Sequence, residues 1–352
     1  MLNQKKQNKK QKEDLTIGVC IPTVRVEAIV RFMEQWAESF QHSLDSGFQI
    51  FVFVHEDAPT AQAYIADISS ATVRHTCHTD LESELLEKQW IIPRGSGACR
   101  SFPMYLAWKA GCEFIITLDD DCFPLKEDST IFFEEHLNSF QLDQWFRTID
   151  GLNPRGIPYG DRGILPVLLN HGVWCGVPDL DGPTSLFYKN RSDQVILRSG
   201  KEVIPPGMFF PLCAMNVCYH RLAIPAAYNL LMGFNDYGFD RFDDIWSGLL
   251  LKKIADHLGY YITNGRPFVV HSKASNPFEN NRKESLGIHV HEFFWKHIAV
   301  APLNGKNIIE CYGQMAEWVK QFPVYFPEAP DQGDYFERLG KAMNEWLSLF
   351  ED

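Results

Sequence analysis

Short runs of apolar residues alternate with segments of helical periodicity in the first third of the chain. The runs are Thr16–Ile21, Gln49–Val54 and Phe114–Leu118, and each is followed by Pro or by a polar, acid-rich group. Between them, Arg25–Phe40 and Ala98–Ala110 carry apolar side chains at helical spacing. Buried strands that alternate with helices predict an α/β fold with a doubly wound, mostly parallel sheet.

The rest of the chain gives weaker patterns. Residues 61–90 are mixed and partly helical, and residues 150–190 are rich in Gly, Pro and Asp, which predicts a long loop. Residues 205–221 mix Pro, Phe, Met and Cys, and we expect them to pack across the sheet. Later elements are a helix over Asp243–Leu258, a short strand over Pro267–Val270, and amphipathic helices over Glu310–Phe322 and Asp334–Phe350.

The length of 352 residues fits one large α/β domain. The Lys-rich start has no apolar run, so residues 1–14 are expected to be a disordered tail rather than a signal peptide; a polybasic contact is the alternative. We expect residues 15–300 to form the catalytic domain and residues 301–352 a helical extension packed on it. No run reaches about 18 apolar residues, so no membrane span is predicted.

Charge and cysteine content narrow the function. The net charge is −12, and −17 without the five Lys of the first twelve residues. An acidic body argues against nucleic acid as a partner, so a nucleotide phosphate would have to be met by a metal or a few Arg. Nine irregularly spaced Cys without a CxxC pair indicate reduced thiols in a cytoplasmic protein.

The clearest chemical signal is Asp119-Asp120-Asp121, directly after the third apolar run. Adjacent carboxylates repel one another unless they are solvated, paired or bound to a cation. Oxygen ligands of this kind suit Mg²⁺ or Mn²⁺, which would keep coordination positions for diphosphate oxygens. His271 is a candidate third ligand beside Asp119 and Asp121, although a lone His after a strand is also typical of a structural residue. Asp120 is expected to face a ribose or sugar.

Polar residues follow the first two apolar runs as well. Ligands of doubly wound sheets bind at the carboxyl ends of the strands, and Thr23, Arg25, Glu56 and Asp57 are expected there. A carboxylate after the second strand would accept hydrogen bonds from uracil N3–H or from ribose hydroxyls. A helix N-cap or a solvated turn explains it equally well.

Arg155 and Arg162 stand seven residues apart in a segment where an intervening Pro and Gly disfavour a helix. A loop with two cations could clamp a diphosphate and neutralise the leaving group. Ordinary loop solubility is the alternative. Arg94 and Arg100 raise the same question near the first strands.

A turn-rich segment carries candidate sugar contacts at His171, Trp174, Asp179 and Asp181. Sugar recognition needs acceptors beside an aromatic face, which this segment offers. Asp and Pro also favour turns for their own sake, so turn chemistry is the alternative.

Asp243 and Asp244 open a helical segment that contains Trp246. Acids at a helix start complement the helix dipole. The functional interpretation is a base or a ligand for a sugar hydroxyl, with the ring of Trp246 lining the pocket.

Eight blocks of the sequence are together long and unusual. They are IPTVR at 21–25, ACRSF at 98–102, TLDDDCF at 117–123, NHGVWCGVPDLDGPT at 170–184, FPLCAMN at 210–216, RFDDIWSG at 241–248, DHLG at 256–259 and HSKASNPF at 271–278. In this order the chain resembles the reversibly glycosylated polypeptides, also called UDP-arabinopyranose mutases.

The resemblance implies a GT-A type fold, Mn²⁺ (or Mg²⁺) dependence, a UDP-sugar substrate, and ring contraction of a UDP-pyranose to the furanose. It also implies self-glycosylation on an Arg, whose closest counterpart is Arg155, with Arg162 as the second of the family's pair. Within the matching blocks we expect Asn216 and Lys273 to contact the substrate. Whether the chain forms a homo-oligomer is left open.

Three functions stay open at this point. They are a mutase, a glycosyltransferase with a separate acceptor and Asp243 or Asp244 as base, and a self-glycosylated scaffold. Arg155 as a nucleophile needs a carboxylate to take a proton, because a guanidinium stays protonated and has no free lone pair. Asp243, Asp244, Asp179 and Asp181 are the candidates for that carboxylate. In the alternative, Arg155 is a cation that holds the sugar near UDP.

Overall fold

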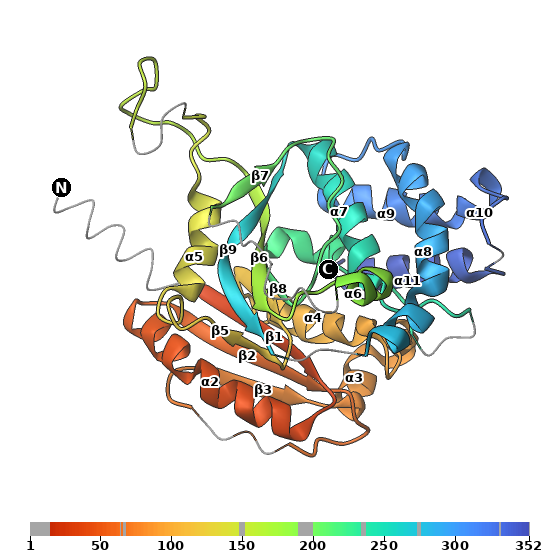
Figure 1. The fold of residues 1–352 in the computed structure, drawn as a ribbon, viewed down its shortest axis with the longest axis horizontal. Helices are drawn as coiled ribbons and strands as arrows, with labels where there is room; N and C mark the ends of the chain where they lie inside the picture. Colours follow the sequence, from red (N-terminus) through yellow and green to blue (C-terminus); the bar gives the residue numbers. More distant parts are fainter. Residues whose placement is uncertain are drawn as a thin grey trace.

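The computed structural model describes residues 15–63, 65, 68–147, 152–188, 200–233, 237–272, 276–330 and 332–351. Its centre is a nine-stranded sheet with helices on both faces (Figure 1). The predicted α/β class is therefore confirmed. Among the described helices, none is both long and apolar enough to cross a membrane.

The strands lie in the order β3-β2-β1-β4-β8-β6-β9-β5, with β7 beside β9. β1 to β4 are parallel, and β6 and β9 run the same way because β8, between β4 and β6, is antiparallel to both. The carboxyl ends of these six strands share one edge, which we call the carboxyl edge. The bounds are β1 Thr16–Thr23, β2 Gln49–Glu56, β3 Thr72–Thr76, β4 Phe114–Leu118, β5 Cys122–Pro124, β6 Val167–Gly176, β7 Glu202–Ile204, β8 Asn216–His220 and β9 Tyr261–His271.

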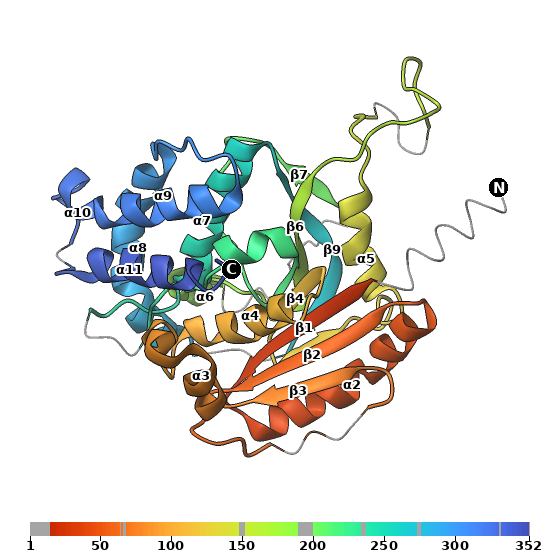
Figure 2. The same ribbon diagram turned by 180° about the vertical axis from the view of Figure 1, so that it is seen from behind.

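Helices cover both faces of the sheet, and α2 and α4 lie on opposite sides of the parallel strands (Figure 2). The α-helices are α2 Val26–Asp45, α3 His78–Leu85, α4 Ser101–Lys109, α5 Phe132–Asn138, α6 Gly182–Tyr188, α7 Asp243–Leu258, α8 Pro277–Ala299, α9 Ile308–Lys320, α10 Phe322–Tyr325 and α11 Tyr335–Leu347. Short 3-10 turns are η1 Leu86–Ile91, η2 Gly97–Arg100, η3 Ser139–Gln141 and η5 Arg221–Ala226.

The alternation of side chains along β1 explains why two cores form. Ile17 and Val19 belong to the core beneath α2, whereas Cys20 belongs to the core beneath α4. Gly18 lies under α4, where an added Cβ would come within 2.8 Å of the Cβ of Ala107. This close approach seats α4 directly on the strand and so fixes the η2 turn that precedes it.

The C-terminal helices join the core beneath α4 rather than forming a separate one. Trp246 of α7 stacks on Phe294 of α8 with ring centroids 4.3 Å apart, and Phe336 of α11 packs against both rings. Both predicted terminal helices are present as α9 and α11. The predicted domain boundary at residue 300 stays a prediction, and residues 1–14 lie outside the described part of the chain.

Two sequence predictions are corrected. The long loop expected over residues 150–190 contains β6, a ten-residue strand inside the sheet. The 23-residue helix α8 was not expected from its sequence. Its buried face includes Asn280, Glu284 and His297 beside apolar residues. These polar positions interrupt the helical spacing of apolar residues from which a helix is predicted.

Candidate functional site

The acid triplet follows β4 at the carboxyl edge, where two arginines neutralise it. Asp120 is only 3 % exposed and accepts hydrogen bonds from Thr23 Oγ1 at 2.6 Å and from Arg25 Nε at 3.1 Å. Arg25 Nη2 also bonds Asp120 and reaches Asp121 Oδ2 at 3.0 Å. Arg100 from the η2 turn pairs with Asp119. Thr23 and Arg25 therefore lie beside the triplet, as predicted. The carboxylate of Asp120 is occupied by its hydrogen bonds from Thr23 and Arg25.

His271 is aimed at Asp121 by the pairing of β5 with β9, which sets Cys122 opposite His271. Its Nδ1 lies 2.9 Å from the carbonyl oxygen of Val177, so that nitrogen is assigned as the donor. Nε2 then carries the lone pair and stands 3.8 Å from Asp121 Oδ1. A histidine whose other nitrogen donates to a backbone carbonyl is oriented as metal-binding histidines usually are.

These residues fit a divalent cation in part. Asp121 and His271 offer an oxygen and a nitrogen toward the same space, while Asp119 shares its carboxylate with Arg100. Across the described ranges, no three His, Cys, Asp or Glu side chains stand close enough to hold a metal together. Asp119 would have to turn from Arg100, or offer its second oxygen, to become a third ligand.

Glu56 and Asp57, after β2, play different parts. Glu56 is buried and accepts hydrogen bonds from the backbone of Gln62 and Ala63 and from His75 Nε2, so it holds the loop that follows the strand. Asp57 Oδ2 accepts from the backbone N–H of Gly95 at 2.5 Å. Asp57 Oδ1 is buried without a hydrogen bond from any described residue. The arrangement therefore favours Asp57 over Glu56 as a ligand for a nucleobase.

Arg94 stands beside Asp57, with its Nε 3.6 Å from Asp57 Oδ1, and its side chain is 48 % exposed. This separation exceeds a hydrogen bond. A nucleobase that enters here would thus meet the Asp57 carboxylate as a hydrogen-bond acceptor and the half-exposed guanidinium of Arg94 as a cation.

The turn over residues 94–100 joins this corner to the acid triplet. Burial raises the pKa of Cys99 to about 12, and the charges of Asp57, Asp243 and Asp119 act in the same direction, so all three carboxylates lie near enough to influence one thiol. A Cβ at Gly97 would lie 2.0 Å from Asp243 Oδ2. Glycine at this position therefore lets the turn pass directly over the Asp243 carboxyl.

Asp243 and Asp244 open α7 within this cluster. Asp244 Oδ2 accepts the backbone N–H of Ala214 at 2.9 Å, and Asp243 Oδ2 lies 3.4 Å from Asn229 Nδ2. Burial raises the pKa of both carboxyls, and the charge of Asp243 raises that of Asp244 further, while Arg100 opposes the rise. The pair thus retains a proton at pH values where an ordinary carboxyl has lost it.

The predicted sugar contacts after β6 divide into two groups. Asp179 joins the site, since the thiol of Cys213 donates to its Oδ2 at 3.0 Å, next to the Ala214 amide that binds Asp244. His171 is 4 % exposed, and burial lowers its pKa to about 4; Asn264 and the backbone of Cys213 take its two nitrogens. Asp181 caps α6 through Thr184. Structural roles account for His171 and Asp181.

Two predicted contacts are wrong. Asn216 is wholly buried, and its amide binds His136 and the carbonyls of Val173 and Pro267. Trp246 is also wholly buried in the core of C-terminal helices. Trp174 is partly exposed with a buried indole N–H that no described residue accepts, so its prediction stays open. Lys273 lies outside the described residues.

Arg155 and Arg162 lie on a projecting arm, which we define as residues 142–147 and 152–165 (Figure 1). The arm begins after Phe140, which packs on Phe114 with ring centroids 4.7 Å apart, and ends before Val167. Phe114 and Val167 are the first residues of β4 and β6, so the arm leaves from the edge opposite the acid triplet.

Among the described residues, the arginines of the arm have no hydrogen-bond or ion-pair partner outside the arm. Arg155 is exposed, and Arg162 Nε donates to the carbonyl of Pro158 at 2.8 Å. Arg162 Nη1 is 3.8 Å from Asp143 Oδ2. The base of the arm is separated from Asp119 by the length of β4. This strand has five residues, or roughly 16 Å at about 3.3 Å per residue. The predicted diphosphate clamp is therefore not formed within this chain as described.

Two residues that sequence reasoning passed over belong to the site. Arg241 stands two residues before α7, and its guanidinium opposes the rise that burial causes in the pKa of Asp243. Glu284 of α8 binds Arg241 and the start of α6. Arg241 could have been found in the block RFDDIWSG, whereas the sequence around Glu284 gives no signal.

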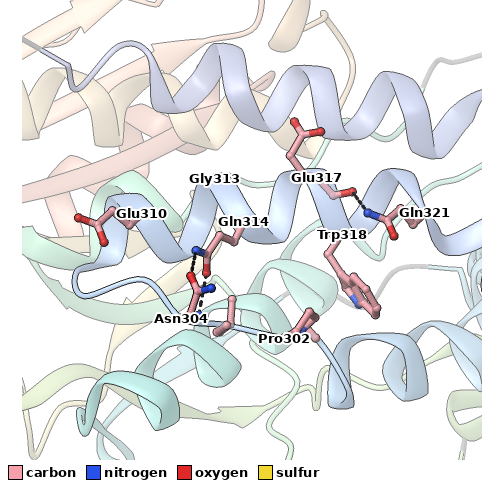
Figure 3. Close-up of a pocket in the computed structure, with 10 residues that line it drawn as sticks. Pro302, Asn304, Glu310, Gly313, Gln314, Glu317, Trp318 and Gln321 are labelled. Atoms are coloured by element: carbon pink, nitrogen blue, oxygen red, sulfur yellow. Dashed lines mark hydrogen bonds between the residues drawn. The ribbon is translucent and has the colours of Figure 1, made fainter.

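A pocket on the C-terminal helices is separate from this site. Figure 3 shows it along α9, with Trp318, Gln314 and Asn304 among ten lining residues. Those ten include acids and amides but no Arg, Lys or His, so the pocket does not suit a diphosphate.

Comparison with known proteins gives a full-length match. The family model described as "Reversibly glycosylated polypeptide" matches residues 11–352. Probable UDP-arabinopyranose mutase 1 of Solanum tuberosum is 31% identical, over 96% of this chain and 90% of that protein. UDP-arabinopyranose mutase 1 of Arabidopsis thaliana is 30% identical, over 96% of this chain and 92% of that protein.

Among solved structures, a Mycobacterium tuberculosis glucosyl-3-phosphoglycerate synthase in complex with Mn²⁺, UDP and phosphoglyceric acid is similar. It is 14% identical, with 84% of this chain and 83% of that chain covered and a TM-score of 0.42. A likeness of this size says nothing about the site.

Proposed function

The chain belongs to the reversibly glycosylated polypeptide family, and on that premise we propose that it converts a UDP-pyranose, UDP-arabinopyranose foremost, into the furanose form. The observation that carries the proposal is the convergence at the carboxyl edge of Asp119–Asp121, the proton-retaining pair Asp243 and Asp244, and the open acceptor Asp57. We also propose a cytoplasmic location, which the nine free thiols support.

Asp121 and His271 would hold a Mn²⁺ or Mg²⁺ ion, with Asp119 as the third ligand. When bound, the ion would stabilise the negative charge of the diphosphate as it leaves the sugar. Asp57 would accept uracil N3–H, which would set the uridine at the β2 end of the same edge.

Ring contraction requires three changes at the anomeric carbon. Its C–O bond to UDP breaks, the hydroxyl one carbon nearer than the ring oxygen forms a bond to it, and its bond to the original ring oxygen then breaks. The ring oxygen gains a proton and the attacking hydroxyl loses one, so the reaction is redox-neutral. Because burial raises the pKa of Asp243 and of Asp244, the pair retains a proton above the pH at which an ordinary carboxyl loses it, which equips it to give the first and take the second. UDP then rejoins the anomeric carbon.

Arg155 as a self-glycosylated residue is part of the same proposal, with a geometric condition. Because the base of the arm lies at the opposite edge of the sheet, Arg155 and Arg162 would have to reach the carboxyl edge of a second copy. Self-glycosylation would then depend on protein concentration, and a second copy's arm would supply the two cations.

A glycosyltransferase with a separate acceptor remains the alternative, which the carboxyls of Asp243 and Asp244 also support as bases. The test is incubation of the purified protein with UDP-arabinopyranose and Mn²⁺, followed by separation of the products. A UDP-furanose product is expected. UDP release that needs an added acceptor would favour the transferase, and UDP binding without either product would favour a non-catalytic scaffold.

A further inference from the structure

Arg241 has an unusual backbone for a residue with a side chain. Its φ is +64°, in the left-handed region that favours glycine. It stands two residues before Asp243, where the chain turns into α7. Strain of this kind persists only where the surrounding structure holds it, and it is common at functional sites.

A buried carboxylate holds the side chain of Arg241. Its Nε donates to Glu284 Oε1 at 2.7 Å, and Glu284 Oε2 accepts the backbone N–H of Gly182 at 2.6 Å. Glu284 is only 4 % exposed. One carboxylate of α8 therefore fixes both the guanidinium and the start of α6, which follows the loop that carries Asp179.

The two Nη groups of Arg241 are left for a ligand. Within the described ranges Arg241 bonds only to Glu284, through Nε, and its side chain is 36 % exposed. Against the opposing effect of burial, Glu284 raises the pKa of Arg241, with Asp179 and Asp240 contributing, and Arg241 in turn opposes the rise that burial causes in the pKa of Asp243. The free end of the guanidinium thus stands among the carboxyls of the site.

Other arginines near the carboxyl edge are already engaged. Arg25 is bound to Asp120 and Asp121, and Arg100 to Asp119. Arg94 stands at the nucleobase corner beside Asp57. A phosphate that enters between the acid triplet and α7 would meet the guanidinium of Arg241, whose Nη groups bond to none of the described residues.

We infer that Arg241 binds the diphosphate of the nucleotide-sugar and that Glu284 is its positioning residue. The inference rests on the proposed function. A guanidinium that is anchored through Nε presents its two Nη donors as a planar fork, which matches two phosphate oxygens. The anchor also reduces the rotational freedom that the side chain would lose on binding.

Calorimetric titration of UDP and of uridine, both with Mn²⁺ present, tests this assignment. In Arg241→Ala, UDP affinity should fall by about 10- to 100-fold, the range expected for lost hydrogen bonds to a charged group. Uridine affinity should be unchanged, because uridine has no phosphate. Arg282→Ala is the matched control, since Arg282 lies on the surface of α8, 72 % exposed, and pairs with Glu279 of the same helix.

A second variant separates binding from folding. Arg241→Gly removes the same guanidinium but relieves the left-handed backbone, so it should melt at a higher temperature than Arg241→Ala. Both should lose UDP affinity to the same extent. A Gly variant that recovered UDP binding would overturn the inference, because the loss in Ala would then come from the backbone.

Glu284→Gln tests the positioning role, because it keeps the shape and removes the charge that orients Nε. UDP affinity should fall less than in Arg241→Ala, and the double variant should be no weaker than Arg241→Ala alone. Additive losses would show that Glu284 acts independently and would overturn its assigned role.

The outcomes distinguish this inference from the proposed function. If the unaltered protein binds no UDP, the proposed function fails. If it binds UDP and Arg241→Ala binds equally well, the inference alone fails. An equal loss for UDP and uridine would indicate a purely structural role and would also overturn it.

Discussion

The carboxyl edge and the arm present arginines in opposite ways. At the carboxyl edge, Arg25 and Arg100 are held by carboxylates that follow β4, and these lie 95 and 19 positions away in the sequence, respectively. On the arm, Arg155 is exposed, and Arg162 contacts Pro158 and Asp143, which also belong to the arm. The first pair is oriented before any ligand arrives, whereas the second is presented outward.

The difference shows what a spacing pattern conveys. The seven-residue separation of Arg155 and Arg162 indicates that both lie on the same segment. It does not indicate which edge of the sheet this segment leaves from, because that edge is set by the directions of β4 and β6. Residues at the ends of parallel strands are placed by topology itself, because those ends share one edge. Cations at the carboxyl edge lie at their own chain's site, whereas under the proposed function those on the arm would act at another copy's site.

The largest effect is expected at the proton-sharing pair. Asp244→Asn should reduce turnover by about 10²- to 10⁴-fold, the range for lost acid–base catalysis, and should leave UDP affinity nearly unchanged. Steady-state kinetics and calorimetry measure the two quantities. A variant with the turnover of the unaltered protein would remove the pair from the chemistry.

The same pair predicts a pH dependence with a definite sign. Because burial raises the folded-state pKa of Asp244, its protonated form stabilises the fold fully below the ordinary carboxyl pKa of about 4. That contribution is lost as the pH rises through the raised value. Thermal unfolding of the unaltered protein should therefore show a stability decline over this window, which Asp244→Asn should flatten. An identical slope in both proteins would contradict the raised pKa.

A smaller effect is expected on the arm. The double variant Arg155→Ala, Arg162→Ala should lose about tenfold to a thousandfold in turnover, as for removed transition-state contacts, while UDP affinity stays constant. Mixing it with Asp121→Asn should restore activity, since one copy then supplies an intact arm and the other an intact site. Failure of the mixture to exceed its components would exclude an arm that works on a second copy.

The smallest effect concerns the nucleobase corner. Asp57→Asn should weaken UDP binding by about tenfold, because it removes a charged acceptor and keeps the shape. Glu56→Gln is the matched control, and it should lower the melting temperature more than the affinity, since Glu56 holds residues 62 and 63. The reverse result would make Glu56 the base-reading residue.

The sequence patterns predict those parts of the site that lie directly after the parallel strands. β1, β2 and β4 were recognisable as continuous apolar runs, and the polar residues after them meet at one edge as expected. The α7 start was equally visible, because its helix has a regular period and opens with two acids. These parts depend on local sequence and on a general rule of sheet topology.

The remaining half depends on contacts that local patterns do not contain. The sequence of β6 predicts a loop because its apolar start gives way to Asn170, His171 and Gly172, where buried polar residues bind one another across strands. Glu284 acts through a helix whose buried face is partly polar. Asn216 and Trp246 were misassigned because a matching block does not reveal which of its side chains face the core.

The most direct test of the whole account is the rate of UDP-furanose formation from UDP-arabinopyranose with Mn²⁺, compared between the unaltered protein and Asp121→Asn. Asp121 is the triplet member that faces both Arg25 and His271. The account predicts furanose from the unaltered protein and none above background from the variant. Equal furanose formation by both proteins would contradict a nucleotide-sugar site at the carboxyl edge.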